Sequence, residues 1–268
     1  MKWSPSLAAA AEALIREVGA WIQTERQNFQ SDAVETKSLN ALVSYVDREA
    51  EERLVAGLSA LLPSSGFLGE EGDYSWTEGG YNWIIDPLDG TTNFIHGLPP
   101  YAISVALMEG DAMRWAAVFE LGQSLLFTAS RGEGAFCNGR RLKVSDRIMA
   151  ESLVSTGFPY YDFSEMGPYL DVLQACFKGS RGVRRFGSAA TDLAWVADDR
   201  FQAFFEHGLA PWDVAAGILL VREAGGVATT FSGACPSDLE LIHARQLVVG
   251  HPLAHSTLVG WTQNFFQA

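Results

Sequence analysis

The stretch from Trp83 to Phe94 constrains this chain more than any other. It reads Trp-Ile-Ile-Asp-Pro-Leu-Asp-Gly-Thr-Thr-Asn-Phe. The apolar run before Asp86 is typical of a buried strand, and Pro87, which lacks an N–H and holds φ near ~−65°, predicts a break there. The side chains of Asp86 and Asp89 should therefore leave one stiff corner. Gly90 opens a turn whose backbone N–H groups suit an anion, as at a helix N-terminus.

This stretch has two interpretations. Asp and Gly are common in ordinary turns, so Asp-Pro-Leu-Asp-Gly alone favours a turn with no chemistry. A turn does not need the ordered polar string that follows, Thr91-Thr92-Asn93. Two rigid carboxylates beside an anion-binding turn instead suit a divalent cation that bridges protein and phosphate.

The composition of the chain is that of a globular protein with an acidic surface. Its 268 residues are 48% hydrophobic and 19% charged, enough for one large domain or two tightly joined ones. The net charge of −13 repels polyanions, so we expect no nucleic acid as a partner. An acidic protein that handles phosphate also needs bound cations to reverse the local charge.

The cysteines and the apolar runs exclude several other classes. Cys137, Cys176 and Cys235 form no Cys-x-x-Cys pair, which argues against a disulfide framework and a thiolate zinc site. Pro5 and Glu12 interrupt the N-terminal apolar stretch, and no apolar run is long enough to span a bilayer. We expect a cytoplasmic protein with reduced thiols that does not bind membranes.

Hydrophobic periodicity predicts alternating helices and strands, with a restart near residue 150. Residues 31–43 carry polar turn signals, and Asn138-Gly139 predicts a hairpin. The expected helices span residues 6–30, 44–62, 164–177, 187–197 and 211–224, with one more at the C-terminus. The expected strands span residues 66–71, 83–86, 102–108, 113–121, 124–129, 152–157, 183–186, 201–206, 227–231 and 247–250.

Three polar residues have a structural explanation at expected helix starts. Asp47 stands three residues after Ser44, in the spacing of a capping box. Ser188 is suited to an N-cap, and Asp213 to the first turn of a helix that begins near Pro211.

The same residues belong to motifs that resemble the inositol monophosphatase family of magnesium-dependent phosphatases. Residues 86–94 are similar to the family segment Asp-Pro-[Leu/Ile]-Asp-Gly-Thr-x-Asn-Phe, and residues 69–71 to its Gly-Glu-Glu. Residues 43–47 resemble Val-Thr-x-x-Asp, residues 187–190 Gly-[Ser/Thr]-Ala-Ala, and residues 212–217 Trp-Asp-x-Ala-[Ala/Gly]-x. The resemblance extends from about residue 37 to the C-terminal helix.

The resemblance implies a metal site made only of oxygen donors. The implied ligands are Glu70, Asp86, the Leu88 carbonyl, Asp89 and Asp213. Hard oxygen donors without His or Cys favour Mg²⁺ over zinc or copper. Four carboxylates brought together would repel one another without cations. We expect two Mg²⁺ ions from this set, and the family implies a third.

The resemblance also assigns roles in catalysis and in substrate binding. Thr91, with Asp47 or Glu70, would orient and deprotonate a water that attacks phosphorus. The backbone N–H groups of Gly90 and Thr91 would hold the phosphate. The implied substrate-binding residues are Asp89, Gly90, Thr91, Gly187, Ser188, Ala189 and Glu206.

For the fold, the resemblance implies an α/β layered sandwich, the sugar-phosphatase fold, with alternating layers of helices and sheets. We expect one domain over residues 1–268, with an N-terminal half to about 148 and a C-terminal half from about 149. Family members commonly form homodimers and are inhibited by lithium, which we expect here too.

The expected activity is hydrolysis of inositol 1-phosphate or a similar small polyol phosphate. Two alternatives remain open. The same metal chemistry would also serve fructose 1,6-bisphosphate, histidinol phosphate or a nucleotide 3′-phosphate, and a non-catalytic regulatory protein could retain this scaffold. The chain departs from the family pattern near Lys37, at Ala41 and at Thr230.

Overall fold

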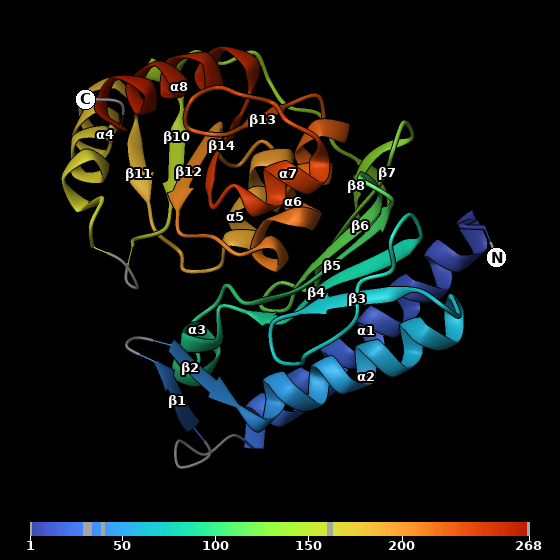
Figure 1. The fold of residues 1–268 in the computed structure, drawn as a ribbon. Helices are drawn as coiled ribbons and strands as arrows, with labels where there is room; N and C mark the ends of the chain where they lie inside the picture. Colours follow the sequence, from blue (N-terminus) through green and yellow to red (C-terminus); the bar gives the residue numbers. More distant parts are fainter. Residues whose placement is uncertain (1, 29–33, 39–40, 160–162, 267–268) are drawn as a thin grey trace.

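The computed structural model describes residues 2–28, 34–38, 41–159 and 163–266, with side chains described outside 34–38 and 41–43. The side chain of Lys37 therefore lies outside the described part. Two larger sheets and the helices around them make up most of the structure (Figure 1). None of the helices in the described ranges is long and apolar enough to cross a bilayer.

The first sheet has seven strands and comes entirely from the N-terminal half. Its strands lie in sequence order, and all neighbours are antiparallel except β3 and β4, which are parallel. The strands are β3 (Gly66–Gly69), β4 (Tyr81–Asp89), β5 (Ala102–Glu109), β6 (Ala112–Glu120), β7 (Leu125–Ser130), β8 (Gly134–Cys137) and β9 (Arg140–Arg141).

The second sheet has five strands from the C-terminal half, in the order β11-β10-β12-β14-β13. Strand β10 is parallel to both of its neighbours, and β14 is antiparallel to both of its own, so the sheet is mixed. The strands are β10 (Leu153–Thr156), β11 (Gly182–Arg184), β12 (Ala203–His207), β13 (Val227–Thr229) and β14 (Gln246–Gly250).

Helices alternate with the two sheets in layers (Figure 1). Helices α1 and α2 contact the outer face of the first sheet, α5 and α6 lie between the sheets, and α4 and α8 contact the second sheet. This is the α/β layered sandwich expected from the sequence. The helices are α1 (Pro5–Asn28), α2 (Tyr45–Leu61), α3 (Thr91–His96), α4 (Met166–Gly179), α5 (Ala189–Ala197), α6 (Pro211–Glu223), α7 (Asp238–His243) and α8 (Pro252–Phe266), with one 3₁₀ turn at Met149–Glu151.

The central position of α6 follows from its composition. Every residue from Val214 to Val221 is buried, because the helix meets neighbouring elements on all sides and is apolar all round. A Cβ at Gly217 would lie 2.4 Å from Cβ of Leu193 on α5, so only glycine permits this close approach. The middle of α5 is thereby held close to the middle of α6.

The structure corrects three expectations. Strand β4 does not break at Pro87 but continues to Asp89. Residues 34–38 and 41–43, expected as turn, belong to the antiparallel strands β1 (Val34–Ser38) and β2 (Ala41–Ser44), whose backbones bond to each other. Helices α3 and α7 were not expected, because six residues are too few to show helical periodicity.

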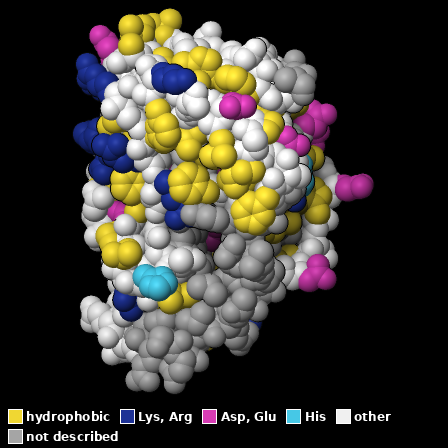
Figure 2. Space-filling model, turned by 90° about the vertical axis from the view of Figure 1, so that its left-hand side faces the viewer, with side chains coloured by type: hydrophobic (Ala, Val, Ile, Leu, Met, Phe, Trp, Pro, Cys, Tyr) yellow, Lys and Arg dark blue, Asp and Glu magenta, His cyan; other side chains and the backbone are white. Residues whose placement is uncertain are grey.

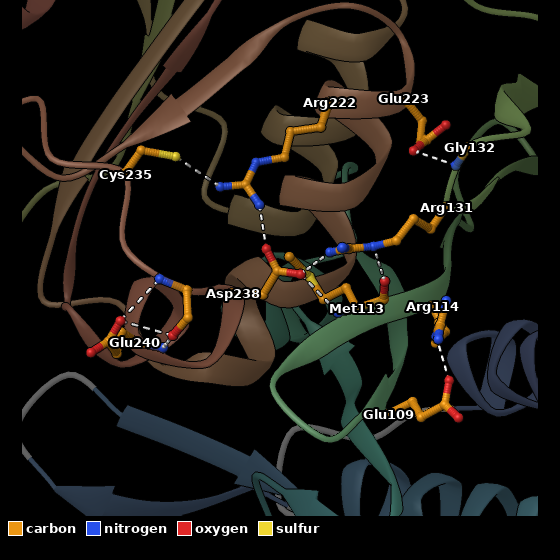
Figure 3. A network of polar contacts seen from close by, with 11 residues as sticks. Glu109, Met113, Arg114, Arg131, Gly132, Arg222, Glu223, Cys235, Asp238 and Glu240 are labelled. Atoms are coloured by element: carbon orange, nitrogen blue, oxygen red, sulfur yellow. Dashed lines mark hydrogen bonds and ion pairs between the residues drawn. The ribbon is translucent and has the colours of Figure 1, made fainter.

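Asp238 links the two halves of the chain (Figure 3). Its Oδ2 accepts a hydrogen bond from the backbone N–H of Met113 on β6 at 2.8 Å and forms an ion pair with Arg131. Its Oδ1 pairs with Arg222 on α6 at 2.5 Å. Because Asp238 is only 7% exposed, removing its carboxylate leaves a buried N–H and two guanidinium groups without this partner.

We predict that Asp238→Ala lowers the free energy of unfolding by about 2–3 kcal/mol, since several hydrogen bonds to one charged group are lost together. Urea unfolding followed by circular dichroism measures the change. Glu109→Ala is the matched control, because its ion pair with Arg114 joins two exposed side chains; we expect it to cost less than about 1 kcal/mol. Equal effects of the two variants would contradict this role of Asp238.

Candidate functional site

Three aspartates from distant parts of the chain converge at one point. One carboxylate oxygen from each of Asp86, Asp89 and Asp213 lies within 4.8 Å of the others. Asp86 and Asp89 come from the end of β4, and Asp213 comes from the first turn of α6. Among the described residues, no Lys or Arg forms an ion pair with any of the three.

A bulge in β4 brings its two aspartates together. In a regular strand, residues three apart point to opposite faces. Asp86 pairs with Ser104 and Asp89 with Ala102, so β4 holds one residue more than β5 between these pairs. This extra residue is a β-bulge, which turns Asp86 and Asp89 toward the same side. Pro87 is tolerated there because a bulge needs no ladder hydrogen bond from it.

Asp213 caps helix α6 and also belongs to the cluster of three aspartates. Its Oδ2 accepts a hydrogen bond from the backbone N–H of Ala210 at 2.7 Å, and Pro211 is the first residue of the helix. The capping role expected from the sequence is therefore confirmed. A carboxylate has two oxygens, and the cap uses one of them.

Asp89 joins the two halves of the chain at the site. Its Oδ2 accepts hydrogen bonds from Ser188 Oγ at 2.5 Å and from the backbone N–H of Ala190 at 2.8 Å. Ser188 is also the N-cap of α5, as expected, because its Oγ accepts from the N–H of Thr191. Gly90, at φ 91°, turns the chain directly after Asp89 in a conformation that favours glycine.

Thr91 and Asp47 form a hydrogen-bonded pair beside the cluster. Thr91 Oγ1 lies 2.8 Å from Asp47 Oδ1 and 3.1 Å from the Leu88 carbonyl oxygen, so its proton points to one of these acceptors. The other oxygen of Asp47 accepts from the N–H of Ser44 at 2.8 Å, which completes the expected capping box of α2. Asp47 therefore caps a helix and holds Thr91.

A cavity of about 580 Å³ opens at the three aspartates. Every expected site residue except Asp47 lines it: Glu70, Asp86, Leu88, Asp89, Gly90, Thr91, Gly187, Ser188, Ala189, Glu206 and Asp213. Figure 2 shows hydrophobic side chains over the upper part of one face of the molecule and an acidic side chain in a recess near its centre.

Two further charged residues line the cavity and were not expected from the sequence. Asp192 lies one helical turn after Ser188 on the same face of α5, which is a spacing that could have identified it. Arg185 is the only Lys or Arg among the described lining residues. Its guanidinium stands 5.8 Å from the ring centre of Phe158, another lining residue.

Burial raises the pKa of the clustered carboxyl groups. The pKa of Asp86 is well above its usual range because of burial, and next because of the negative charges of Glu70, Asp89 and Asp213. Burial and then the charge of Asp89 raise the pKa of Asp213 in the same way. For Asp89, burial raises the pKa to about 6, although hydrogen bonds from Ser188 and Ala190 lower it.

The same causes act on the acids across the cavity. Burial, followed by the charge of Asp89, raises the pKa of Glu206 to about 8. Burial and the charge of Glu206 raise the pKa of Asp192. The cavity thus combines oxygen donors with an unfavourable concentration of negative charge. Bound divalent cations relieve that repulsion, and the residues present fit such cations in both type and position.

Comparison with known proteins agrees with this geometry. A model of the inositol monophosphatase family matches residues 3–263. An inositol-1-monophosphatase of Rhizobium meliloti is 45% identical over 226 residues, which cover 84% of this chain and 82% of that protein. A Nus factor SuhB of Pseudomonas aeruginosa is 42% identical over 250 residues, 91% of each chain.

Solved structures show the same fold. An extragenic suppressor protein suhB from Bartonella henselae superposes with a TM-score of 0.89 at 35% identity, over 96% of this chain and 98% of that one. An IMPase of Thermotoga maritima gives a TM-score of 0.86 at 32% identity, over 98% and 99%. The chain described here belongs to the inositol monophosphatase family.

Proposed function

We propose that this phosphatase hydrolyses inositol 1-phosphate or a similar small polyol phosphate with Mg²⁺ ions as cofactors. Membership of the family implies phosphatase activity and metal dependence. The observation that carries the proposal is the convergence of Asp86, Asp89 and Asp213 within 4.8 Å at one cavity. These crowded carboxylates need cations, and a phosphate needs them equally in so acidic a cavity.

Two sets of oxygens would hold the cations. Glu70, Asp86 and the Leu88 carbonyl form one set, and Asp86, Asp89 and Asp213 form the other. When bound, Mg²⁺ lowers the pKa of water and stabilises the charge that develops on the oxygens of the ester. A third ion near Glu70 remains part of the proposal.

The hydroxyl of Thr91 is held in a position that suits it to orient a water molecule. Because its proton points to Asp47 or to the Leu88 carbonyl, its oxygen is left to accept a hydrogen bond from water. A carboxylate, Asp47 through Thr91 or Glu70 directly, then accepts the proton that the attacking water loses. The backbone N–H groups of Gly90 and Thr91 would bind phosphate oxygens.

The part of the cavity lined by the C-terminal half of the chain suits the hydroxyl groups of a polyol. Gly187, Ser188 and Ala189 are small and allow a substrate to approach the backbone closely. Glu206 lies close to Gly157, where an added Cβ would clash with the Glu206 carboxylate. With its pKa raised to about 8, Glu206 carries a proton near neutral pH in the metal-free chain and can donate to one hydroxyl while accepting from another.

Several expectations stay predictions. These are inhibition by lithium, a homodimer, a cytoplasmic location and the absence of nucleic acid among the partners. Some relatives carry the name Nus factor, so nucleic-acid binding is a property to measure for this chain.

We predict Mg²⁺-dependent phosphate release from inositol 1-phosphate, because both proposed cation sites are built from oxygen donors. The same assay should include fructose 1,6-bisphosphate, histidinol phosphate and a nucleotide 3′-phosphate, and EDTA should abolish release. A higher kcat/KM for one of these three would replace the proposed substrate. Absence of release from all four would favour the non-catalytic alternative.

Asp89→Asn should lower kcat at least about 100-fold, because a cation ligand worth several kcal/mol of charge stabilisation is weakened while the side-chain shape is kept. Asp146→Asn, the same change at an exposed position, is the matched control and should leave kcat unchanged. The two rates are compared at saturating Mg²⁺, with circular dichroism to show that both variants fold. Full activity of Asp89→Asn would refute the proposed site.

The metal-free protein should become less stable as the pH rises from about 4.5 to about 8. Between the unfolded-state and the raised folded-state pKa, a carboxyl group binds its proton only in the folded chain, so the stability from that proton is lost as the pH rises through this window. Glu206, with its pKa at about 8, titrates in this window, and the pKa of Asp86 and of Asp213 is also raised. The loss is up to about 1.4 kcal/mol per pH unit for each proton released.

Urea unfolding in EDTA at several pH values measures this dependence. Saturating Mg²⁺ should reduce it, since the cations replace the protons, and Glu206→Gln should reduce it in EDTA. An unfolding free energy in EDTA that rises over the same pH window would contradict the assignment of these groups.

A further inference from the structure

Glu51 is a buried acid that the proposed function does not use. It lies on α2 and is 1% exposed. Its Oε2 accepts a hydrogen bond from the backbone N–H of Glu71 at 3.1 Å, whereas its Oε1 has no hydrogen-bond partner in the described part of the chain. A carboxylate without a cation is costly to bury, so its position needs an explanation.

The carboxylate of Glu51 fits closely against the chain on both sides of Glu70. On one side, a Cβ at Gly69 would lie 2.5 Å from Glu51 Oε2, so a side chain at residue 69 would displace this carboxylate. On the other side are the N–H of Glu71 and the hydroxyl of Tyr74. Burial, followed by the charge of Glu51 and a hydrogen bond to it, raises the pKa of that hydroxyl.

The same face of α2 also holds the other end of the site. Asp47 precedes Glu51 by four residues, so the two side chains are neighbours one helical turn apart. Asp47 binds Thr91, at 2.8 Å, while Glu51 binds the segment around Glu70. One rigid helix therefore contacts Thr91 and the backbone next to Glu70, and both of these residues are proposed to act on the attacking water.

We infer that Glu51 is a positioning residue, which holds Glu70 at the cation site through its hydrogen bond to the N–H of Glu71. Helix α2 then fixes Glu70 and Thr91 relative to each other. This inference rests on the proposed function, because it takes Glu70 to be a cation ligand. It assigns the effect to the geometry of the hydrogen bond and not to the charge of Glu51.

Four variants separate geometry from charge. Glu51→Ala removes the hydrogen bond and the charge. Glu51→Gln removes only the charge, because its side-chain oxygen still accepts from the N–H of Glu71. Glu51→Asp keeps the charge, but its side chain is one methylene too short to reach the backbone N–H of Glu71. Glu52→Ala removes an exposed acid from the next position on the same helix and is the matched control.

Isothermal titration of each metal-free protein with MgCl₂ measures the affinity for the cation directly. Residues that orient metal ligands typically change metal affinity 10–100-fold, so we expect about tenfold weaker binding for Glu51→Ala and Glu51→Asp. Glu51→Gln and Glu52→Ala should stay within about twofold of the wild type. The Mg²⁺ concentration that gives half-maximal phosphatase activity should shift in the same order.

Several results would overturn the inference. If Glu51→Gln weakens binding as much as Glu51→Ala, charge is responsible. If Glu51→Ala and Glu51→Asp lower the melting temperature but bind Mg²⁺ like the wild type, the role of Glu51 is only structural. If Glu51→Ala does not fold, the Mg²⁺ affinities of Glu51→Asp and Glu51→Gln are compared instead, and equal affinities would overturn the inference. A wild-type protein that binds no Mg²⁺ would instead refute the proposed function itself.

Discussion

The repulsion among Asp86, Asp89 and Asp213 is the constraint on which the rest of the site depends. Two unit charges 4 Å apart repel by about 4 kcal/mol at an effective dielectric constant near 20. Burial is the first cause of the raised pKa of Asp86 and Asp213, and the charges of the neighbouring acids add to it. A chain that holds three of them together needs rigid supports, and the β4 bulge and the first turn of α6 are such supports.

Hydrogen bonds between the two halves of the chain complete this frame. Asp89 binds Ser188 and the N–H of Ala190, both at the start of α5. Asn93 adds a second link, because its Nδ2 donates to the carbonyl oxygens of Pro100 at 2.8 Å and of Phe186 at 2.6 Å. The polar string after Gly90 thus has a structural function as well as its proposed chemical one.

Features set by neighbouring residues could be predicted from the sequence. The capping box at Ser44 and Asp47 and the N-cap at Ser188 use short spacings that act within one helical turn. The antiparallel strands after Ala102 follow from their apolar runs and turn residues. The family motifs then indicated which acids gather, and the structure brings these side chains to one cavity.

Features set by distant parts of the chain could not be predicted. The continuation of β4 through Pro87 depends on the length of β5, which pairs beside it. Glu51 lies in the acidic run Glu-Ala-Glu-Glu of an amphipathic helix, where a glutamate normally faces water. The end of β3 and the segment after it lie against its carboxylate. The sequence contains no local signal for the first outcome. The spacing of Glu51 to Leu54 and Leu58 does place it on the apolar face of α2, but its contact with the segment after β3 has no local signal.

Diffraction from crystals grown with MnCl₂ tests the central claim most directly, because Mn²⁺ takes oxygen ligands like Mg²⁺ and scatters anomalously. The account predicts anomalous peaks within about 2.5 Å of carboxylate oxygens of Asp86, Asp89 and Asp213, with Glu70 beside one of them. An anomalous map without a peak among these aspartates, at saturating Mn²⁺, would contradict it.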